Sequence, residues 1–142
     1  MKVYLCVDDN NGMMFNHRRQ SRDSVVIQDI IKSSTGFPVF ISPYSSSLFA
    51  EYDQKIVSDD FLFLAGPDDP CFVEDRPLAP FEKEITELTV YHWNRSYPAD
   101  VKLDLNLTNS NYKLLSVEEL VGTSHEKITK EVYIHATENE MA

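Results

Sequence analysis

The chain has 142 residues, of which 42% are hydrophobic and 25% charged, and its formal net charge at pH 7 is −10. This size and composition are typical of one globular domain, residues 1–142, and no run approaches the roughly 18 apolar residues of a membrane span, which argues against a membrane protein. An acidic chain repels the phosphate backbone, which argues against general nucleic-acid binding.

The start of the chain and its two cysteines predict a cytoplasmic protein. The apolar run within MKVYLCVDDNN is too short for the core of a secretory signal, and no small-residue cleavage site follows it. Cys6 lies inside a predicted strand and Cys71 opens another, a pattern typical of buried thiols in a reducing compartment.

Strands and helices alternate in the first part of the chain. The predicted strands are KVYLCV (2–7) and FPVFIS (37–42), by their β-branched and aromatic content. Between them Ser21 or Asp23 can cap a helix with one apolar face, and Gly36 is expected to end it. Pro43 breaks the second strand, and a short helix is predicted to follow it.

The middle of the chain adds further elements of the same kinds. They are predicted strands at FLFLA (61–65), CFVED (71–75) and LTVYHW (88–93), and a helix at 77–85. The resulting order, β-α-β-α-β-β-α-β, predicts a single α/β domain with a mixed, mainly parallel sheet and flanking helices.

The last 40 residues change character. VKLDLNL (101–107) alternates apolar and polar residues like a half-buried strand, and residues 112–119 and 127–135 predict an antiparallel hairpin around VGTSHE. A helix over 126–133, capped by Ser124, is the alternative, and even spacing of apolar residues in the second arm favours the strand. An open edge at this hairpin could serve a homodimer.

Two groups of motifs carry a resemblance to a known family. VDDNNGM (7–13) with Asn16 beyond it, and YKLLSVEE (112–119) with ITKEVY (128–133), together with the element order, resemble dihydrofolate reductase over nearly the whole chain. The resemblance implies a dihydrofolate reductase-like fold. For activity it implies hydride transfer from NADPH to a pterin.

The sequence departs from that family at three positions. HRRQSRD (17–23) stands where a Leu-Pro-Trp element leads to the pterin-binding carboxylate, with Asp23 the only nearby acid, and ISPYSSSLF (41–49) stands where Gly-Arg-Lys-Thr grips cofactor phosphates. VYHWNR (90–95) replaces the glycine-rich turn that lets the diphosphate approach the backbone. These departures argue against ordinary NADPH chemistry and leave the cofactor unknown.

The chain is also similar to a group of small bacterial proteins that carry the name ribonuclease Z, sharing VDDNNGM, RRQSRD, YPAD and SHEKITKEVY. That name implies a two-metal phosphodiesterase with a His-x-His-x-Asp-His run. The sequence has no such run.

Ligands of α/β folds bind at the carboxyl edge of the parallel strands, and the sequence delivers polar and aromatic residues there. They are Asp8, Asp9, Asn10, Ser42, Tyr44, His92, Trp93, Asn94 and Arg95. Arg18, Arg19 and Arg22 form a basic cluster that can hold a phosphate, the alternative being a solvated loop. Ser45, Ser46 and Ser47 can bind an anion at a helix start, or act only as helix caps.

Candidate catalytic groups are Asp8, Asp9, Asp23 and His125. Asp8 and Asp9 could hold Mg²⁺ beside the arginines, although neighbouring side chains in a strand point to opposite sides, and a turn is the default interpretation. His125 with Glu126 could do acid–base work, the alternative being a solvated turn, and the same holds for His17.

Two hypotheses remain. The first is a binding protein on a reductase-like scaffold that holds an anionic or nucleotide-like small molecule near the serines, Trp93 and Arg95, or docks a protein partner there. The second is an enzyme, either a diverged oxidoreductase or a metal-dependent phosphoester hydrolase around Asp8 and Asp9.

Overall fold

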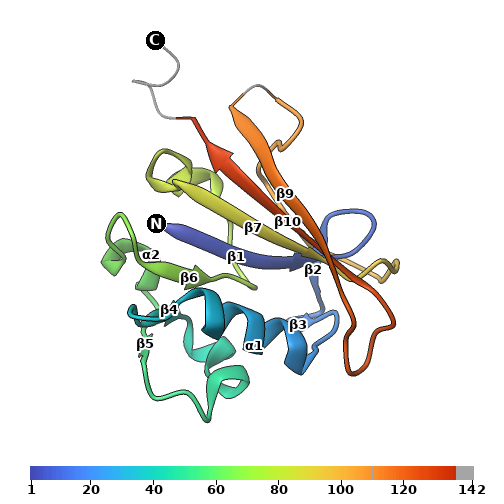
Figure 1. The fold of residues 1–142 in the computed structure, drawn as a ribbon, viewed down its shortest axis with the longest axis horizontal. Helices are drawn as coiled ribbons and strands as arrows, with labels where there is room; N and C mark the ends of the chain where they lie inside the picture. The colour runs from blue at the N-terminus through green and yellow to red at the C-terminus, as the bar shows by residue number, and fades with distance from the viewer. Residues whose placement is uncertain (110, 137–142) are drawn as a thin grey trace.

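Five parallel strands form the centre of the fold in the computed structural model, which describes residues 1–109 and 111–136. They are β1 (Lys2–Val7), β4 (Val39–Ile41), β5 (Lys55–Val57), β6 (Pro70–Phe72) and β7 (Glu87–His92). The hairpin of β9 (Tyr112–Leu120) and β10 (Ile128–His135) extends this sheet, with β10 antiparallel to β7. The strand order is β5-β4-β6-β1-β7-β10-β9, which places the hairpin at one edge of a mixed sheet (Figure 1).

A second, smaller sheet follows the first strand. It contains β3 (Arg18–Arg19), β2 (Gly12–Phe15) and β8 (Val101–Lys102), in the order β3-β2-β8. Asn16 and His17 join β2 to β3 with φ angles of 51° and 62°, as in a two-residue hairpin turn of the primed type. His17 therefore lies in an exposed turn.

Short helices connect the strands. They are α1 (Ser24–Ser33), the 3₁₀ helix η1 (Pro43–Phe49), α2 (Phe61–Leu64) and the 3₁₀ helix η2 (Ala79–Glu84). Asp23 is the N-cap of α1, and the helix ends at Ser33, before the expected stop at Gly36, which has a φ of +93°. No helix in the part of the chain that the structure describes is long and apolar enough to cross a membrane.

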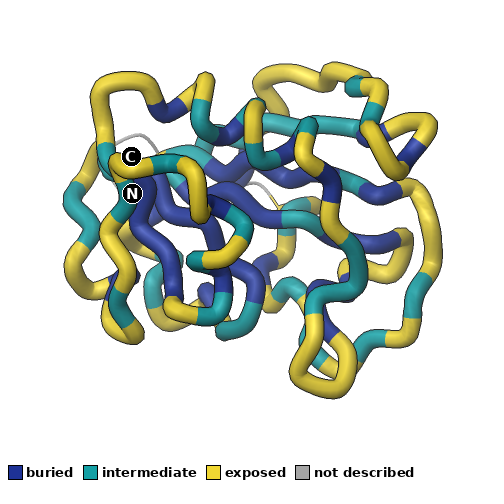
Figure 2. Tube along the Cα trace, turned by 90° about the horizontal axis from the view of Figure 1, so that it is seen from below, coloured by how far each residue is buried: buried dark blue, intermediate teal, exposed yellow. Residues whose placement is uncertain are grey.

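The core lies on both faces of β1, as expected for a central parallel strand. Val3, Leu5 and Val7 pack in one apolar cluster, and Tyr4 packs in another with Val26 and Ile30 of α1. Figure 2 shows buried chain running through the middle of the molecule, with exposed loops around it. The sheet is thus covered on both faces, and α1 is held against one of them.

Most predicted strands are confirmed. β1, β4, β6 and β7 lie within or next to the runs 2–7, 37–42, 71–75 and 88–93, and both arms of the C-terminal hairpin form. The alternative helix over 126–133 is wrong, because Ile128–His135 pairs with β9 along its length and with β7 over residues 129–134.

Three predictions were wrong or incomplete. FLFLA is not a strand: Phe61–Leu64 forms α2, with Phe63 and Leu64 exposed, and a short apolar run does not distinguish the two structures. Only Val101–Lys102 of the run 101–107 is a strand, since Asp104 instead accepts hydrogen bonds from the backbone of Leu78 and Ala79. The three-residue edge strand β5 was not predicted, and the helix expected over 77–85 is the shorter 3₁₀ helix η2.

Candidate functional site

The start of α1 and the turn of the β9–β10 hairpin meet at one buried carboxylate, that of Asp23. One of its oxygens, Oδ1, accepts hydrogen bonds from Val25 N, Thr123 N and Thr123 Oγ1, each at 3.0 Å. The other, Oδ2, accepts from Ser124 N at 2.8 Å and lies 3.0 Å from His125 Nδ1. The carboxylate has no exposed side-chain surface, so it joins two segments about 100 residues apart in the sequence.

These contacts determine the charge state of Asp23. Burial by itself raises the pKa of a carboxyl group, but the hydrogen bonds from His125 and from the backbone of Thr123, Ser124 and Val25 outweigh it. The pKa of Asp23 therefore lies well below its ordinary value, and the group is a carboxylate at neutral pH.

His125 continues the hydrogen-bond chain. Its Nε2 lies 2.9 Å from Ser21 Oγ, and its ring stacks on the indole of Trp93, with 4.5 Å between ring centroids and 23° between ring planes. Both rings are buried, at 6% and 4% exposure for His125 and Trp93. Ser21, His125 and Asp23 thus form a linear chain of hydroxyl, imidazole and carboxylate, called here the Ser21–His125–Asp23 chain.

A small cavity lies beside this chain, enclosed by residues of β1, β6, α1 and the loop before α1. Its volume is about 20 Å³, room for one water molecule, and Ser21, Cys6, Phe72 and Trp93 are among its lining residues. An adjoining open groove of about 380 Å³ runs between α1 and η1, and is called here the α1–η1 groove. The cavity and the groove share four lining residues, which are Arg22, Asp23, Ile27 and Leu48.

The three clustered arginines do not act together. Arg19 forms a two-pronged ion pair with Glu74, with Nε–Oε2 at 2.8 Å and Nη2–Oε1 at 3.0 Å, and its guanidinium lies over the ring of Tyr44. Ser45 Oγ donates to the same carboxylate at 2.7 Å. Arg19 and Ser45 are therefore used inside the protein, within a nearly buried network.

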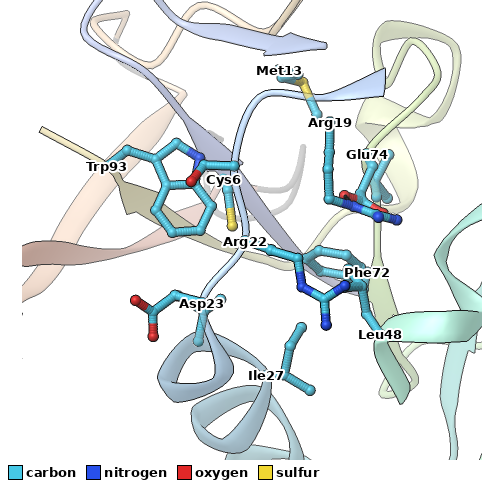
Figure 3. A pocket seen from close by; sticks show the side chains of 13 residues that line it. Cys6, Met13, Arg19, Arg22, Asp23, Ile27, Leu48, Phe72, Glu74 and Trp93 are labelled. Atoms are coloured by element: carbon cyan, nitrogen blue, oxygen red, sulfur yellow. Dashed lines mark hydrogen bonds and ion pairs between the residues drawn. The ribbon is translucent and has the colours of Figure 1, made fainter. Parts of the chain in front are cut away.

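Arg22 differs from Arg19. Its side chain forms no hydrogen bond or ion pair with the residues that the structure describes, and it lines both the cavity and the groove. Phe72 and Ile27 line the same cavity, and in Figure 3 the carboxylate of Asp23 points away from the guanidinium of Arg22. Arg18 lines a separate depression with Phe15 and Tyr97, and Arg95 is exposed after β7.

The two aspartates after β1 are separated. Asp8 is buried, and its oxygens accept from Asn10 N, Gly12 N, Tyr97 N and Gln20 Nε2 at 2.7 to 3.2 Å. Burial raises the pKa of Asp8, and these hydrogen bonds outweigh that effect and lower it. Asp9 is exposed, and no group of three or more potential metal ligands is present among residues 1–109 and 111–136.

The remaining predicted site residues are spread over several places. Ser42 rather than Ser45 caps η1, and Ser46 Oγ donates to Pro43 O, while Ser47 lines the α1–η1 groove. His92 contacts the carboxylate of Glu131, on the sheet face opposite Trp93. Asn10 is exposed in the loop after β1, and Tyr44 and Asn94 hold neighbouring loops by hydrogen bonds.

Both cysteines are free thiols. Burial raises the pKa of Cys6 well above its ordinary value, and burial raises that of Cys71 to about 12. Since the thiolate is the nucleophile, neither is a ready one at neutral pH.

Comparison with known proteins shows the fold. No protein-family profile and no curated protein sequence matches the chain. A solved structure that resembles it is a dihydrofolate reductase from Enterococcus faecalis in complex with NADP(H) and RAB-propyl, with a TM-score of 0.65 at 5% sequence identity, covering 94% of this chain and 95% of that one. The protein therefore has the dihydrofolate reductase-like fold that the sequence predicted, and the resemblance to proteins named ribonuclease Z finds no support.

Sequence reasoning missed how the site is assembled. Asp23 and His125 were separate candidates, and Ser21 was considered only as a helix cap. Gly122 is the one local signal: a Cβ there would stand 2.5 Å from Asp23 Oδ2 and 2.8 Å from His125 O, so the turn needs glycine to approach the carboxylate.

Proposed function

We propose that this protein binds an anionic small molecule with a flat, apolar body in the α1–η1 groove, and that Arg22 is the cation that holds it. The observation that carries the proposal is the guanidinium of Arg22, unpaired among the described residues, at a groove of about 380 Å³. A groove of this size, with apolar walls and a few polar groups, is typical of small-molecule sites.

The groove offers both kinds of contact that such a ligand needs. Its apolar lining comes from Ile27, Ile31, Leu48, Phe49 and Tyr52. Its polar lining comes from Arg22, Ser24, Gln28, Ser47 and Glu51, together with Asp23, whose carboxylate is already occupied. Arg22 is thus the residue suited to a carboxylate, sulfonate or phosphate of the ligand.

The scaffold is one on which a known protein binds ligands, since the Enterococcus faecalis reductase was solved in complex with NADP(H) and RAB-propyl. The region after β7 is poorly suited to a dinucleotide such as NADPH. Trp93 is packed on His125, and His92 is bonded to Glu131, so bulky side chains stand where close approach to the backbone would be needed. This supports a ligand other than NADPH.

No observation favours the phosphoester hydrolase. The four donors around Asp8 already use its oxygens, and Asp9 is exposed beside it. The oxidoreductase stays as the second candidate because of its scaffold.

Ligand binding can be followed by thermal unfolding and by the fluorescence of Trp93, the only tryptophan in the sequence. The probes are folate, AMP, NADPH and MgCl₂, tested separately. A ligand at 100 times its dissociation constant adds about 2.7 kcal/mol to the free energy of unfolding, enough for a clear shift of the melting temperature.

Arg22→Ala is the test variant, and Arg18→Ala is the matched control, an exposed arginine on the separate depression. Loss of a charge-assisted contact of about 2 kcal/mol should weaken binding roughly 30-fold in Arg22→Ala and leave Arg18→Ala unchanged. Equal binding by wild type and Arg22→Ala, or no shift with any probe, would contradict the proposal. A shift with NADPH that persists in Arg22→Ala would favour the oxidoreductase.

A further inference from the structure

We propose that Ser21 is the nucleophile of an ester-hydrolysing site, with His125 as its general base and Asp23 as the residue that positions His125. The observation is the geometry of the Ser21–His125–Asp23 chain: Oγ to Nε2 at 2.9 Å, and Nδ1 to Oδ2 at 3.0 Å. A nucleophile within hydrogen-bond reach of a base, with the base oriented by a third group, is the general arrangement of activated serine.

The order of the hydrogen bonds determines the direction of proton transfer. Asp23 is a carboxylate with no proton to donate, so Nδ1 of His125 carries the hydrogen and donates it. In the neutral ring Nε2 is then the acceptor, and it faces the hydroxyl of Ser21. The indole of Trp93 stacks on one face of the imidazole and helps to fix its orientation.

The cavity beside the chain has room for one water molecule, and it adjoins the larger α1–η1 groove. Ser21 is half-buried and lines the cavity, and the cavity shares Arg22, Asp23, Ile27 and Leu48 with the α1–η1 groove. Of the two arginines lining the cavity, Arg19 is held by Glu74, which leaves Arg22 to bind an anionic group of the substrate.

The reaction is balanced without a cofactor. Ser21 Oγ bonds to the ester carbonyl carbon while its proton moves to His125 Nε2, and the C–O bond to the alcohol breaks as His125 protonates the leaving oxygen. Water then attacks the acyl-serine and gives a proton to His125, which returns it to Ser21 Oγ when the acyl bond breaks. The net change is ester and water to carboxylic acid and alcohol, with no oxidation or reduction.

The substrate class rests on the proposed function: an ester whose anionic group binds Arg22 and whose apolar part lies in the groove. The nucleophile itself does not rest on it, so two neutral reagents test it separately. Diisopropyl fluorophosphate forms an O–P bond to an activated serine and releases fluoride, and p-nitrophenyl acetate transfers a small acetyl group and releases p-nitrophenol.

Intact-mass spectrometry and peptide mapping should find one phosphoryl adduct on Ser21, and p-nitrophenyl acetate should give a burst of about one equivalent. Ser21→Ala should abolish both, and His125→Gln should slow both at least 100-fold. Ser116→Ala is the control, an exposed serine on β9 that lines neither the cavity nor the groove, and should react like wild type. Circular dichroism and the melting temperature establish that each variant is folded.

The outcomes separate this inference from the proposed function. Arg22→Ala should lose anion binding and still be labelled by the neutral reagents. Labelling of wild type with no ligand binding would contradict only the proposed function. Adducts on other serines, equal rates in His125→Gln, or no reaction with either reagent would overturn the assignment of Ser21.

Discussion

Two aspartates, Asp8 and Asp23, are buried among the residues that the structure describes. Their immediate surroundings are similar, and they differ in the groups that lie beyond their hydrogen-bond donors. Each lies beside a turn, each accepts several backbone hydrogen bonds, and the pKa of each is lowered. A glycine approaches each carboxylate, since a Cβ at Gly12 or Gly122 would stand 2.9 Å from Asp8 or 2.5 Å from Asp23.

The difference lies in the last donor. The carboxylate of Asp8 receives three peptide N–H groups and the amide of Gln20, none of which passes a proton on. That of Asp23 receives an imidazole, whose second nitrogen meets a hydroxyl. A buried carboxylate whose oxygens are all hydrogen-bonded therefore indicates only that it holds a loop in place. A catalytic role is indicated when one of its donors is an imidazole that also contacts a hydroxyl, as at Asp23.

The largest expected effect comes from removing each carboxylate. Asp23→Ala should lower the free energy of unfolding by about 3–5 kcal/mol, because it leaves one buried and four partly buried donor contacts without their acceptor. Asp8→Ala should cost about 1–3 kcal/mol, because water can reach part of its exposed loop. Equilibrium urea unfolding measures both.

A larger loss in Asp8→Ala than in Asp23→Ala would contradict this ranking. Asp23→Asn separates stability from chemistry in the same experiment. It keeps the size of the side chain and loses the carboxylate that fixes the tautomer of His125, so it should slow labelling of Ser21 and change its pH profile. Asp8→Asn should leave labelling unchanged.

The next effect tests the close approach at Gly122. A methyl group there would meet Asp23 Oδ2, His125 O and Ile128 Cδ1 at 2.5 to 3.0 Å, and two of these atoms are held in place by hydrogen bonds. Gly122→Ala should therefore cost about 1–3 kcal/mol and loosen the stacking of Trp93 on His125, visible in its fluorescence. Gly66→Ala is the control, since its only contact within 4 Å is at 3.3 Å.

A Gly122→Ala variant as stable as wild type, with unchanged tryptophan fluorescence, would show that the hairpin turn can move away from Asp23. The Ser21–His125–Asp23 chain would then be less rigid than its hydrogen bonds indicate.

The sequence predicted the sheet better than the site, for a physical reason. Strands such as KVYLCV and the C-terminal hairpin are encoded locally by β-branched residues and alternation, so their existence could be predicted from short segments. α2 could not, because four apolar residues suit either structure, and only tertiary packing of Phe61 decides. β5 has only three residues, too few to show the alternation of apolar and polar residues that predicts a strand.

The site depends on contacts that no local pattern records. Asp23 and His125 are 102 positions apart, and Ser21 and His125 are 104 apart. The arginine cluster shows that residues close together in the sequence can have different surroundings in the structure. Arg19 and Arg22 look equivalent in HRRQSRD, but strand β3 directs Arg19 to Glu74, whereas Arg22 lies beyond that strand and lines the cavity and the groove.

The smallest expected effect is on the acid side of the stability curve. A carboxyl group whose pKa is lowered by folding contributes stability that is fully present above its ordinary value of 3.8 and is lost as the pH falls through the folded value. Wild type should therefore lose stability below about pH 4, by at most about 1.4 kcal/mol per pH unit for each such carboxylate. Asp23→Asn and Asp8→Asn should each flatten the dependence of the free energy of unfolding on pH, measured by urea unfolding between pH 2 and 6.

Because Asp23 has the imidazole of His125 among its donors, replacing Asp23 should flatten this dependence more than replacing Asp8. If the free energy of unfolding depends on pH equally in the two variants, the imidazole lowers the pKa of Asp23 no more than the donors around Asp8 lower that of Asp8. The comparison of the two aspartates would then hold for their neighbours and not for their contribution to stability.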